Sequence, residues 1–420
     1  MLDPRPYLLS YVLTITLSLS GLFSLSLSAI IGAALTVLFG VNDRLFTFEE
    51  ALTFIDLDLI TLLIGVMIVA EVIDRSGLFR LLAIKLIKRT QSKPKHLLVI
   101  VPLFAAIVSL LVSDEAALLL SAAILISISR ILGIDPKPVA LSAAVMVNLG
   151  GTGTLIGSIP NMAIGLRAGL DFIEFATYIL PCEFMLYGVT LAYLFAIFKD
   201  KVPSEIAVLP DIREEVDIRE VVKGAFILAF MLTTLVFSSF LGSPASVAAL
   251  ASAVLALAIC GYDTTEVFRE LDWDTVFFTA AFNVIVEVLS EAEALQGLSQ
   301  LLHTISASEW IGYSMVTLFI SAIVSIVIPN LVVALTFIPV VNGLQLLDKR
   351  PVWSALVLGV NLPGITLPTS SFVIVMTIGA LRKEGIHIDP WEVAKIGIPL
   401  TFIWLSLAAL YIFLLFSVFL

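Results

Sequence analysis

The chain has 420 residues, of which 60% are hydrophobic and 14% are charged, and its formal net charge is −11. This composition excludes an ordinary soluble globular protein, in which about half of the residues are apolar and about a quarter are charged. No run of like charge is long enough to indicate nucleic-acid binding. Apolar stretches of about 17 to 25 residues recur along the whole chain, and each is long enough to cross a bilayer as a helix. The sequence therefore predicts an all-α polytopic membrane protein whose partners are the lipid bilayer and a small inorganic ion or other solute.

Three crossing helices are expected at the start of the chain, and the first of them takes the place of a cleaved signal peptide. An amphipathic stretch follows, and after it come two hydrophobic runs joined at a polar tip. An interrupted helix and a final helix complete this half. In chain order the predicted elements span residues 7–19, 24–40, 57–75, 77–90, 97–112, 116–131, 138–169 and 175–198.

The second half of the chain repeats this pattern. Asp56 in "DLDLITLL" aligns with Asp272 in "DWDTVFFT" at an offset of 216 residues, and Asp114 aligns with Asn330 at the same offset. Further along, "VNLGGTGT" matches "VNLPGITL", and "DFIEFATYILP" matches "DPWEVAKIGIP". The corresponding elements are expected at residues 222–242, 244–261, 273–290, 294–306, 311–347, 352–383 and 394–419.

This repeat predicts an inverted architecture. If each pair of hydrophobic runs forms a re-entrant hairpin, each half crosses the membrane an odd number of times, so the two halves must have opposite orientations. We expect about ten crossing helices, two re-entrant hairpins and two broken helices. The first repeat is expected over residues 1–198 and the second over residues 224–420, with a cytoplasmic linker at residues 199–223 between them.

The distribution of positive charge predicts the orientation, because Lys and Arg concentrate in cytoplasmic loops. With the basic segment 75–96 placed inside, 18 of the 23 Lys and Arg residues fall in cytoplasmic segments. Both termini are then extracytoplasmic, and the chain is expected in the plasma membrane. The cationic residues left outside are Arg5, Arg44, Arg167, Lys349 and Arg350.

The polar interruptions of the two long helices are the strongest functional signal. In a bilayer, non-helical backbone is tolerated only where it is buried in protein or faces a cavity. Paired interruptions at corresponding points of two halves indicate a transporter's binding site. Glycines can also serve only to pack helices closely, as in the Gly-x-x-x-Gly pattern. The residues expected at the first break are Asn148, Gly150, Gly151 and Thr152, and those expected at the second are Asn361, Gly364 and Thr366.

The tip of the first predicted hairpin carries Ser113, Asp114 and Glu115 between apolar runs, and the second tip carries Asn330. An acid within the membrane is a functional hypothesis by default, although the tip could also be a loop at the membrane surface. We expect Asp114, with Glu115, to carry the coupling ion or proton, and Asn148 and Thr152 to complete that site. A sodium ion would contact Ser113, Asp114 and Asn148.

Other polar residues are weaker candidates. Glu71 and Glu287 lie near the ends of predicted helices, where snorkelling to the membrane surface or a structural ion pair is an equal alternative to ion binding. Cys182 and Cys260 lie in different predicted helices, so we expect no disulfide, no metal cluster and no cofactor beyond the coupling ion.

The segment "NLGGTGTLIGSIPN", with "RSGLFRLLAIKL" and "RKEGIHIDPWEVAKIGIPL", resembles the ion transporter superfamily in its arsenite-permease and sodium-proton-antiporter branch. That superfamily is related to the divalent anion:sodium symporters. The resemblance implies inverted repeats, two hairpins, two broken helices and a substrate site where they meet. It also implies a homodimer formed by a scaffold part.

Charge narrows the expected substrate. No Lys or Arg lies at the tips of the proposed hairpins or in the breaks, whereas acids do. This favours secondary active transport of a cation or a neutral solute such as arsenite, coupled to protons or sodium. The alternative within transport is a sodium-coupled carboxylate or anion transporter, with helix dipoles supplying the positive potential. A passive channel and an intramembrane hydrolase are less favoured, the latter because no hydrolase motif is present. An enzyme is therefore not expected.

Overall fold

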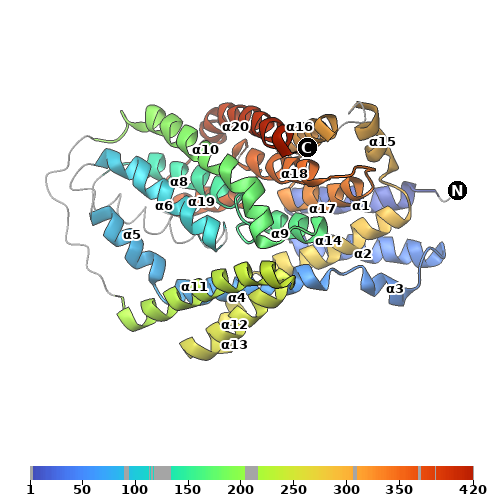
Figure 1. Ribbon diagram of the computed structural model, residues 1–420, viewed down its shortest axis with the longest axis horizontal. Coiled ribbons are helices and arrows are strands. Elements are labelled where there is room, and N and C mark those ends of the chain that lie inside the picture. Colours follow the sequence, from blue (N-terminus) through green and yellow to red (C-terminus); the bar gives the residue numbers. More distant parts are fainter. Residues whose placement is uncertain are drawn as a thin grey trace.

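The computed structural model describes most of the chain, and Figure 1 shows its helices. All regular structure in the described residues is helical, which confirms the predicted all-α class. The described residues are 3–88, 94–112, 114, 117, 134–203, 216–305, 310–367, 370–383 and 385–419.

The helices of the first half follow the predicted order. They are α1 (Arg5–Ser20), α2 (Leu25–Asn42), α3 (Phe48–Thr53), α4 (Leu57–Arg75), α5 (Leu78–Lys88), the 3-10 helix η1 (Pro94–His96), α6 (Leu97–Leu111), α8 (Pro136–Gly150), α9 (Ile159–Ala168) and α10 (Phe172–Phe198).

The second half contains an equivalent series. Its helices are α11 (Ile218–Leu241), α12 (Ala245–Cys260), α13 (Thr264–Glu270), α14 (Trp273–Glu291), α15 (Gln296–Ile305), α16 (Trp310–Ser325), α17 (Asn330–Asn342), α18 (Arg350–Asn361), the 3-10 helix η2 (Leu362–Ile365), α19 (Phe372–Lys383) and α20 (Pro390–Phe419).

Most helix ends lie within a few residues of the predicted ones, and α4 covers the predicted range 57–75. Helix α11 begins at Ile218, inside the segment expected to be a linker. The short helices α3 and α13 were not predicted. They start after the capping residues Thr47 and Asp263, which are themselves related by the repeat offset. Both helices are too short to show a helical pattern of apolar residues. The second run of the first hairpin, expected at 116–131, lies outside the described residues except for Ala117.

Six segments of the described chain are long and apolar enough to cross a membrane. They are α2, the segment comprising α3 and α4, α10, α11, α14 and α20. Shorter apolar helices include α6, α12, α16 and α17. Helices of this kind, with broken and re-entrant pieces among them, form a polytopic membrane fold.

Carboxylates at the starts of the crossing helices explain why these helices begin where they do. Asp56 accepts a hydrogen bond from the backbone nitrogen of Leu59 at 3.0 Å, and Asp272 accepts one from that of Thr275 at 3.1 Å. A side-chain acceptor at this position satisfies a backbone donor that has no partner within the helix. The same cap is therefore present at the same place in both halves.

The two halves are interleaved. Helix α2 packs against α14, and α12 packs against α4, so each half supplies one member to each pair. Within each half, α6 packs on α8 and α16 packs on α18. In Figure 1, α9 and α17 lie near the middle of the molecule, between α4, α11 and α12 on one side and α10 and α20 on the other. Contacts of α9 with α4, α17 and α18 agree with this central position.

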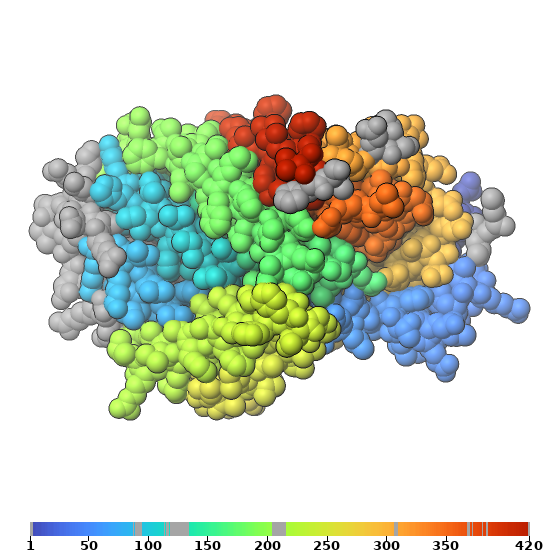
Figure 2. All heavy atoms as spheres, in the orientation of Figure 1, coloured from blue at the N-terminus to red at the C-terminus, as the bar shows by residue number. Residues whose placement is uncertain are grey.

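Large apolar side chains on the outer helices are exposed, as expected for a surface that faces lipid. Figure 2 shows α11 and α12, coloured yellow-green and yellow, on the lower outer side of the molecule. On these helices Phe237, Phe240 and Val254 are 58%, 75% and 61% exposed. On α20, Phe402 is 74% exposed.

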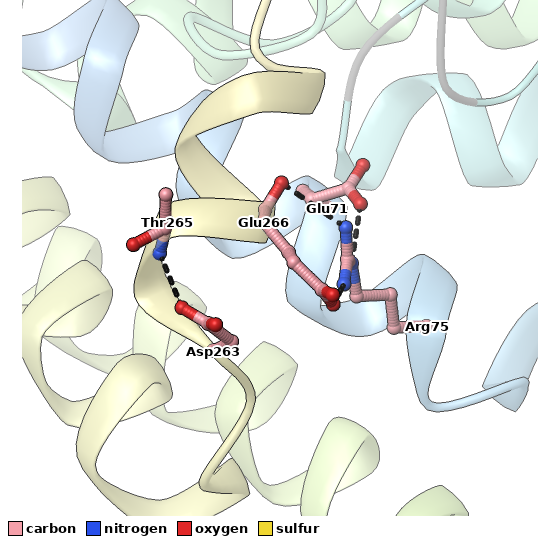
Figure 3. Close-up of polar contacts among 5 residues, drawn as sticks. All are labelled: Glu71, Arg75, Asp263, Thr265 and Glu266. Atoms are coloured by element: carbon pink, nitrogen blue, oxygen red, sulfur yellow. Dashed lines mark hydrogen bonds and ion pairs between the residues drawn. The ribbon is translucent and has the colours of Figure 1, made fainter.

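A cluster of charged residues connects α4 to α13 (Figure 3). The Nε of Arg75 donates to Oε1 of Glu71 at 2.6 Å, and its guanidinium lies 3.5 Å from Oε2 of Glu266. Asp263 caps α13 by accepting a hydrogen bond from the backbone nitrogen of Thr265 at 2.8 Å. Glu71 is thus part of a structural ion pair.

Candidate functional site

The first helix break lies between α8, which ends at Gly150, and α9, which starts at Ile159. The intervening residues 151–158 are buried. Glycine lowers the stability of a helix at this point, and the residues that leave the helix no longer pair their carbonyl groups within it. Such carbonyls must find other partners inside the protein.

Asn161 supplies those partners. Its Nδ2 atom lies 2.8 to 3.0 Å from three backbone oxygens, those of Gly151, Thr152 and Thr154. An amide nitrogen carries two hydrogens, so it can pair with two of these carbonyls at once. Asn161 is fully buried and stabilises the shape of the break.

The second break follows α18 and includes the 3-10 turn η2 before α19 begins at Phe372. Hydrogen bonds of hydroxyl groups connect this break to neighbouring segments. The Oγ1 atoms of Thr366 and Thr401 lie 2.8 Å apart, which connects the break to α20. Ser370 donates to the carbonyl oxygen of Ile326 at 2.9 Å, which connects the break to the residues after α16.

The two breaks contact each other through asparagines. Asn148 Nδ2 donates to the backbone oxygen of Asn361 at 3.1 Å, and Asn361 Nδ2 donates to Oδ1 of Asn161 at 2.8 Å. Ser158 donates to Oδ1 of Asn361 at 3.2 Å. A Cβ atom built on Gly364 would overlap Oδ1 of Asn148, so this glycine allows the close approach. The structure thus brings together residues predicted for both breaks.

The first hairpin tip lies against the first break. A Cβ atom on Gly151 would overlap the carboxylate of Asp114, and the Asp114 backbone nitrogen donates to the Gly157 oxygen at 3.2 Å. The hydroxyl of Ser109 lies 3.1 Å from Asp114 Oδ1 and 2.8 Å from the Val147 oxygen. Asp114 is therefore held between α6 and the break. Ser113 and Glu115, also predicted for this site, lie outside the described residues.

The second hairpin tip repeats the same contacts. The hydroxyl of Ser325 lies 3.0 Å from Asn330 Oδ1 and 2.7 Å from the Val360 oxygen. These residues are the repeat equivalents of Ser109, Asp114 and Val147. Each tip is thus attached to the helix that precedes its own break, and the two halves differ at this place by an acid in one and an amide in the other.

The predicted residues do not all converge on Asp114. The amide of Asn148 is directed to the second break, and the hydroxyl of Thr152 donates to the Asn148 backbone oxygen at 3.3 Å. A Cβ atom on Gly150 would overlap the backbone of Ala106, so Gly150 permits close packing of α8 on α6. The packing role considered for the glycines thus applies to Gly150.

Sequence reasoning missed Glu183, in the middle of α10. It is fully buried, and Tyr187 donates a hydrogen bond to its Oε1 atom, whereas its Oε2 atom has no hydrogen-bond partner among the described residues. A Cβ atom on Gly153 would overlap Oε2, so the carboxyl group lies directly against the first break. The available signal was a single acid inside a long apolar helix, which by itself indicates function.

A cluster of charged residues joins the C-terminal end of α9 to the helices α4 and α14. Arg167 lies 2.8 Å from Asp56 and 3.0 Å from Glu287, on α14. These residues line a small cavity with Asn283 and Pro339. Glu287 is therefore part of an ion pair, as is its repeat equivalent Glu71. Such partly exposed ion pairs contribute little to stability, and these two link α9 to the start of α4 and to α14.

Comparisons with known proteins identify the family. A model of the CitMHS family, described as citrate transporters, matches residues 11–360. A 46 kDa membrane protein of Mycobacterium leprae is 26% identical over 96% of this chain and 97% of its own length. An uncharacterized transporter of Mycobacterium tuberculosis is 27% identical over 92% of each chain.

The fold is also that of a solved transporter. The crystal structure of the Alcanivorax borkumensis YdaH transporter, described as having an unusual topology, superimposes with a TM-score of 0.59. The match covers 97% of this chain and 98% of the YdaH chain at 13% identity, so it concerns the fold alone.

Proposed function

The chain belongs to the citrate transporter family, and from this premise we propose that it is a secondary transporter of citrate or a similar carboxylate, coupled to protons or sodium. The observation that carries the proposal is the contact between the two helix breaks through Asn148 and Asn361. In transporters with inverted repeats, substrate and coupling ions bind where discontinuous helices meet. The family supports the carboxylate alternative better than the cation or arsenite substrate that charge alone favoured.

A carboxylate substrate needs positive potential, and helix N-termini can supply it. Helices α9 and α19 both start at a break, and α17 starts at the second hairpin tip. Arg167 is a poor anchor for the substrate, because it already contacts two carboxylates. We place the carboxylate near the second half's neutral polar residues, Asn330, Asn361 and Thr366, where no described acid contacts them.

The coupling cation belongs in the first half under this proposal. Asp114 is held against Gly151, and a proton or sodium ion at this carboxylate would offset the negative charge of a nearby substrate. Ser113, Glu115 and Asn148 complete the proposed sodium site. A cation in one half and an anion in the other would attract each other, which gives a physical basis for coupling.

A second candidate is proton- or sodium-coupled transport of a cation or of arsenite, as in the arsenite-permease and antiporter branch. The acids Asp114 and Glu183 beside the first break favour it. Under either function we propose that the protein is a homodimer in the plasma membrane, as the family resemblance implies. We also propose that both termini lie outside the cell, which the distribution of Lys and Arg supports.

Purified protein in liposomes tests the choice. Uptake of labelled citrate would be measured under an imposed sodium gradient and, separately, an imposed pH gradient, with excess succinate as competitor and protein-free liposomes as the control. We expect citrate to accumulate above its external concentration. Arsenite flux or sodium-proton exchange without citrate uptake would overturn the carboxylate proposal in favour of the second candidate. Citrate flux that only dissipates its own gradient would indicate a channel.

A further inference from the structure

Glu183 has an unusual environment for a carboxyl group. It lies within the 27-residue apolar helix α10, with no exposed surface. One oxygen accepts a hydrogen bond from Tyr187, and the other, Oε2, has no hydrogen-bond partner in the described part of the chain. In the part of the chain that the structure describes, no Lys, Arg or His forms an ion pair with it. An ionised carboxylate buried in this way is strongly disfavoured unless a proton or a cation neutralises it.

The space for this carboxyl group exists because residue 153 is glycine. Any side chain at this position would overlap Oε2. The first break therefore makes direct contact with Glu183, and a displacement of the break relative to α10 would change the surroundings of Oε2. Changes of this kind alter the affinity of a carboxyl group for a proton.

In the second half of the chain, the residue that corresponds to Glu183 is not an acid. The match between "DFIEFATYILP" and "DPWEVAKIGIP" continues so that Glu183 aligns with Thr401, and the match between the breaks aligns Gly153 with Thr366. Thr366 and Thr401 are joined by their hydroxyl groups at 2.8 Å. A neutral link between break and helix in one half is thus replaced by a glycine and an acid in the other.

Asp114 and Glu183 lie against the same run of glycines. Asp114 contacts Gly151, and Glu183 contacts Gly153. The titratable groups that act on Glu183 among the described residues are Tyr187 on its own helix and Asp114 from the hairpin tip, while the neighbouring Cys182 is itself influenced by Glu183. The helices α6, α8, α11, α18 and α20, which pack on α10, supply no further described group that acts on it.

We propose that Glu183, close to the coupling-ion residue Asp114, is a further proton-binding residue of the first half, which takes up a proton on Oε2 in one conformation of the transport cycle and releases it in another. The step forms and breaks one O–H bond. The proton comes from water on one side of the membrane and returns to water on the other, so no further reactant is needed. Tyr187 positions the carboxyl group through Oε1, and Gly153 provides the space for Oε2. The inference rests on the proposed secondary transport, but proton binding can be measured without a substrate.

Infrared difference spectroscopy of the purified protein gives that measurement, since a protonated carboxyl group has its own carbonyl band that shifts in heavy water. We expect a band that titrates with pH in the wild type and is lost in Glu183→Gln. The same band in Glu183→Gln would overturn the proposal. A titrating band in a protein that fails to transport citrate would overturn the proposed carboxylate transport and leave the proton site intact.

Transport in liposomes provides the second readout. Glu183→Gln should lose citrate accumulation driven by a pH gradient but keep exchange of internal for external citrate, which moves no net proton. Retention of pH-driven accumulation by this variant would refute the proposal. If Glu183→Gln fails to fold, Gly153→Ala tests the same group, because its methyl group must displace Oε2 and should shift the titration of the band. Gly188→Ala is the matched control, since a Cβ atom there meets no other atom within 4 Å. An unshifted titration in Gly153→Ala would contradict the proposal.

Discussion

Replacement of Asn161 by alanine tests whether one side chain stabilises the first helix break. Asn161 Nδ2 lies 2.8 to 3.0 Å from three backbone oxygens of the break, and two of them can be paired at once. The variant leaves two buried carbonyl groups without a partner, at about 1 to 3 kcal/mol each, so we expect a loss of about 2 to 6 kcal/mol. In the wild type, Oδ1 of Asn161 also accepts a hydrogen bond from Asn361, so the variant should weaken the contact between the two breaks.

The unfolding temperature in detergent can be followed with a thiol-reactive fluorescent dye, because Cys182 and Cys260 are both free and buried. Asn161→Ala should unfold several degrees below the wild type. Ser158→Ala is the control, since it removes a single hydrogen bond of 3.2 Å and should cost about 1 kcal/mol. If Asn161→Ala unfolds at the same temperature as Ser158→Ala, the carbonyl groups have other partners and the reasoning fails.

Three further predictions concern the site and its orientation. Gly151→Leu should abolish citrate uptake in liposomes while the protein still inserts, because a side chain would displace the Asp114 carboxylate. The control variant Gly188→Leu should transport normally. Citrate uptake by both variants would show that Gly151 only allows close helix packing. Asp114→Asn should remove gradient-driven citrate uptake and flatten the pH dependence of that uptake. Glu71→Gln should have the smaller effect, because Glu71 pairs with the neighbouring Arg75. An unchanged pH dependence in Asp114→Asn would place the coupling site elsewhere. Single cysteines in the 199–223 segment should resist an impermeant reagent in intact cells, and their labelling would contradict the inverted orientation.

The positions of the helices could be predicted from the sequence because each crossing segment has its own local signal. Apolar length, capping residues and the internal repeat are all visible along the chain, and α4 was predicted to the residue. The helix breaks were also predicted, because glycine and proline act on the backbone at their own positions. Helices α3 and α13 carry only a cap and no apolar period, so they were missed.

The partners of the break residues could not be predicted in the same way, because they depend on how distant segments pack. The carbonyl groups that Asn161 contacts are known only from the structure, and nothing in the sequence assigns the amide of Asn148 to the second break rather than to Asp114. Glu183 lies 30 residues from Gly153 in sequence, and only the packing of α10 on the break brings them together. Its isolation in an apolar helix was nevertheless a signal that could have been used.

The two halves share the contacts that position the hairpin tips, but they differ in the acidic residues. Ser109 and Ser325 make the same pair of contacts to the tip and to the helix before the break, so this arrangement is common to both repeats. The acids are not shared, since the repeat equivalents of Asp114 and Glu183 are an asparagine and a threonine. Burial and a neighbouring acid both disfavour an ionised carboxyl group, and Glu183 is fully buried beside the same run of glycines that Asp114 contacts. Under the proposed function, the acids beside the first break would bind protons or sodium, while the neutral residues Asn330, Asn361 and Thr366 would leave an anionic substrate free of repulsion at short range. This division would reconcile a carboxylate substrate with the acids that alone favoured a cation.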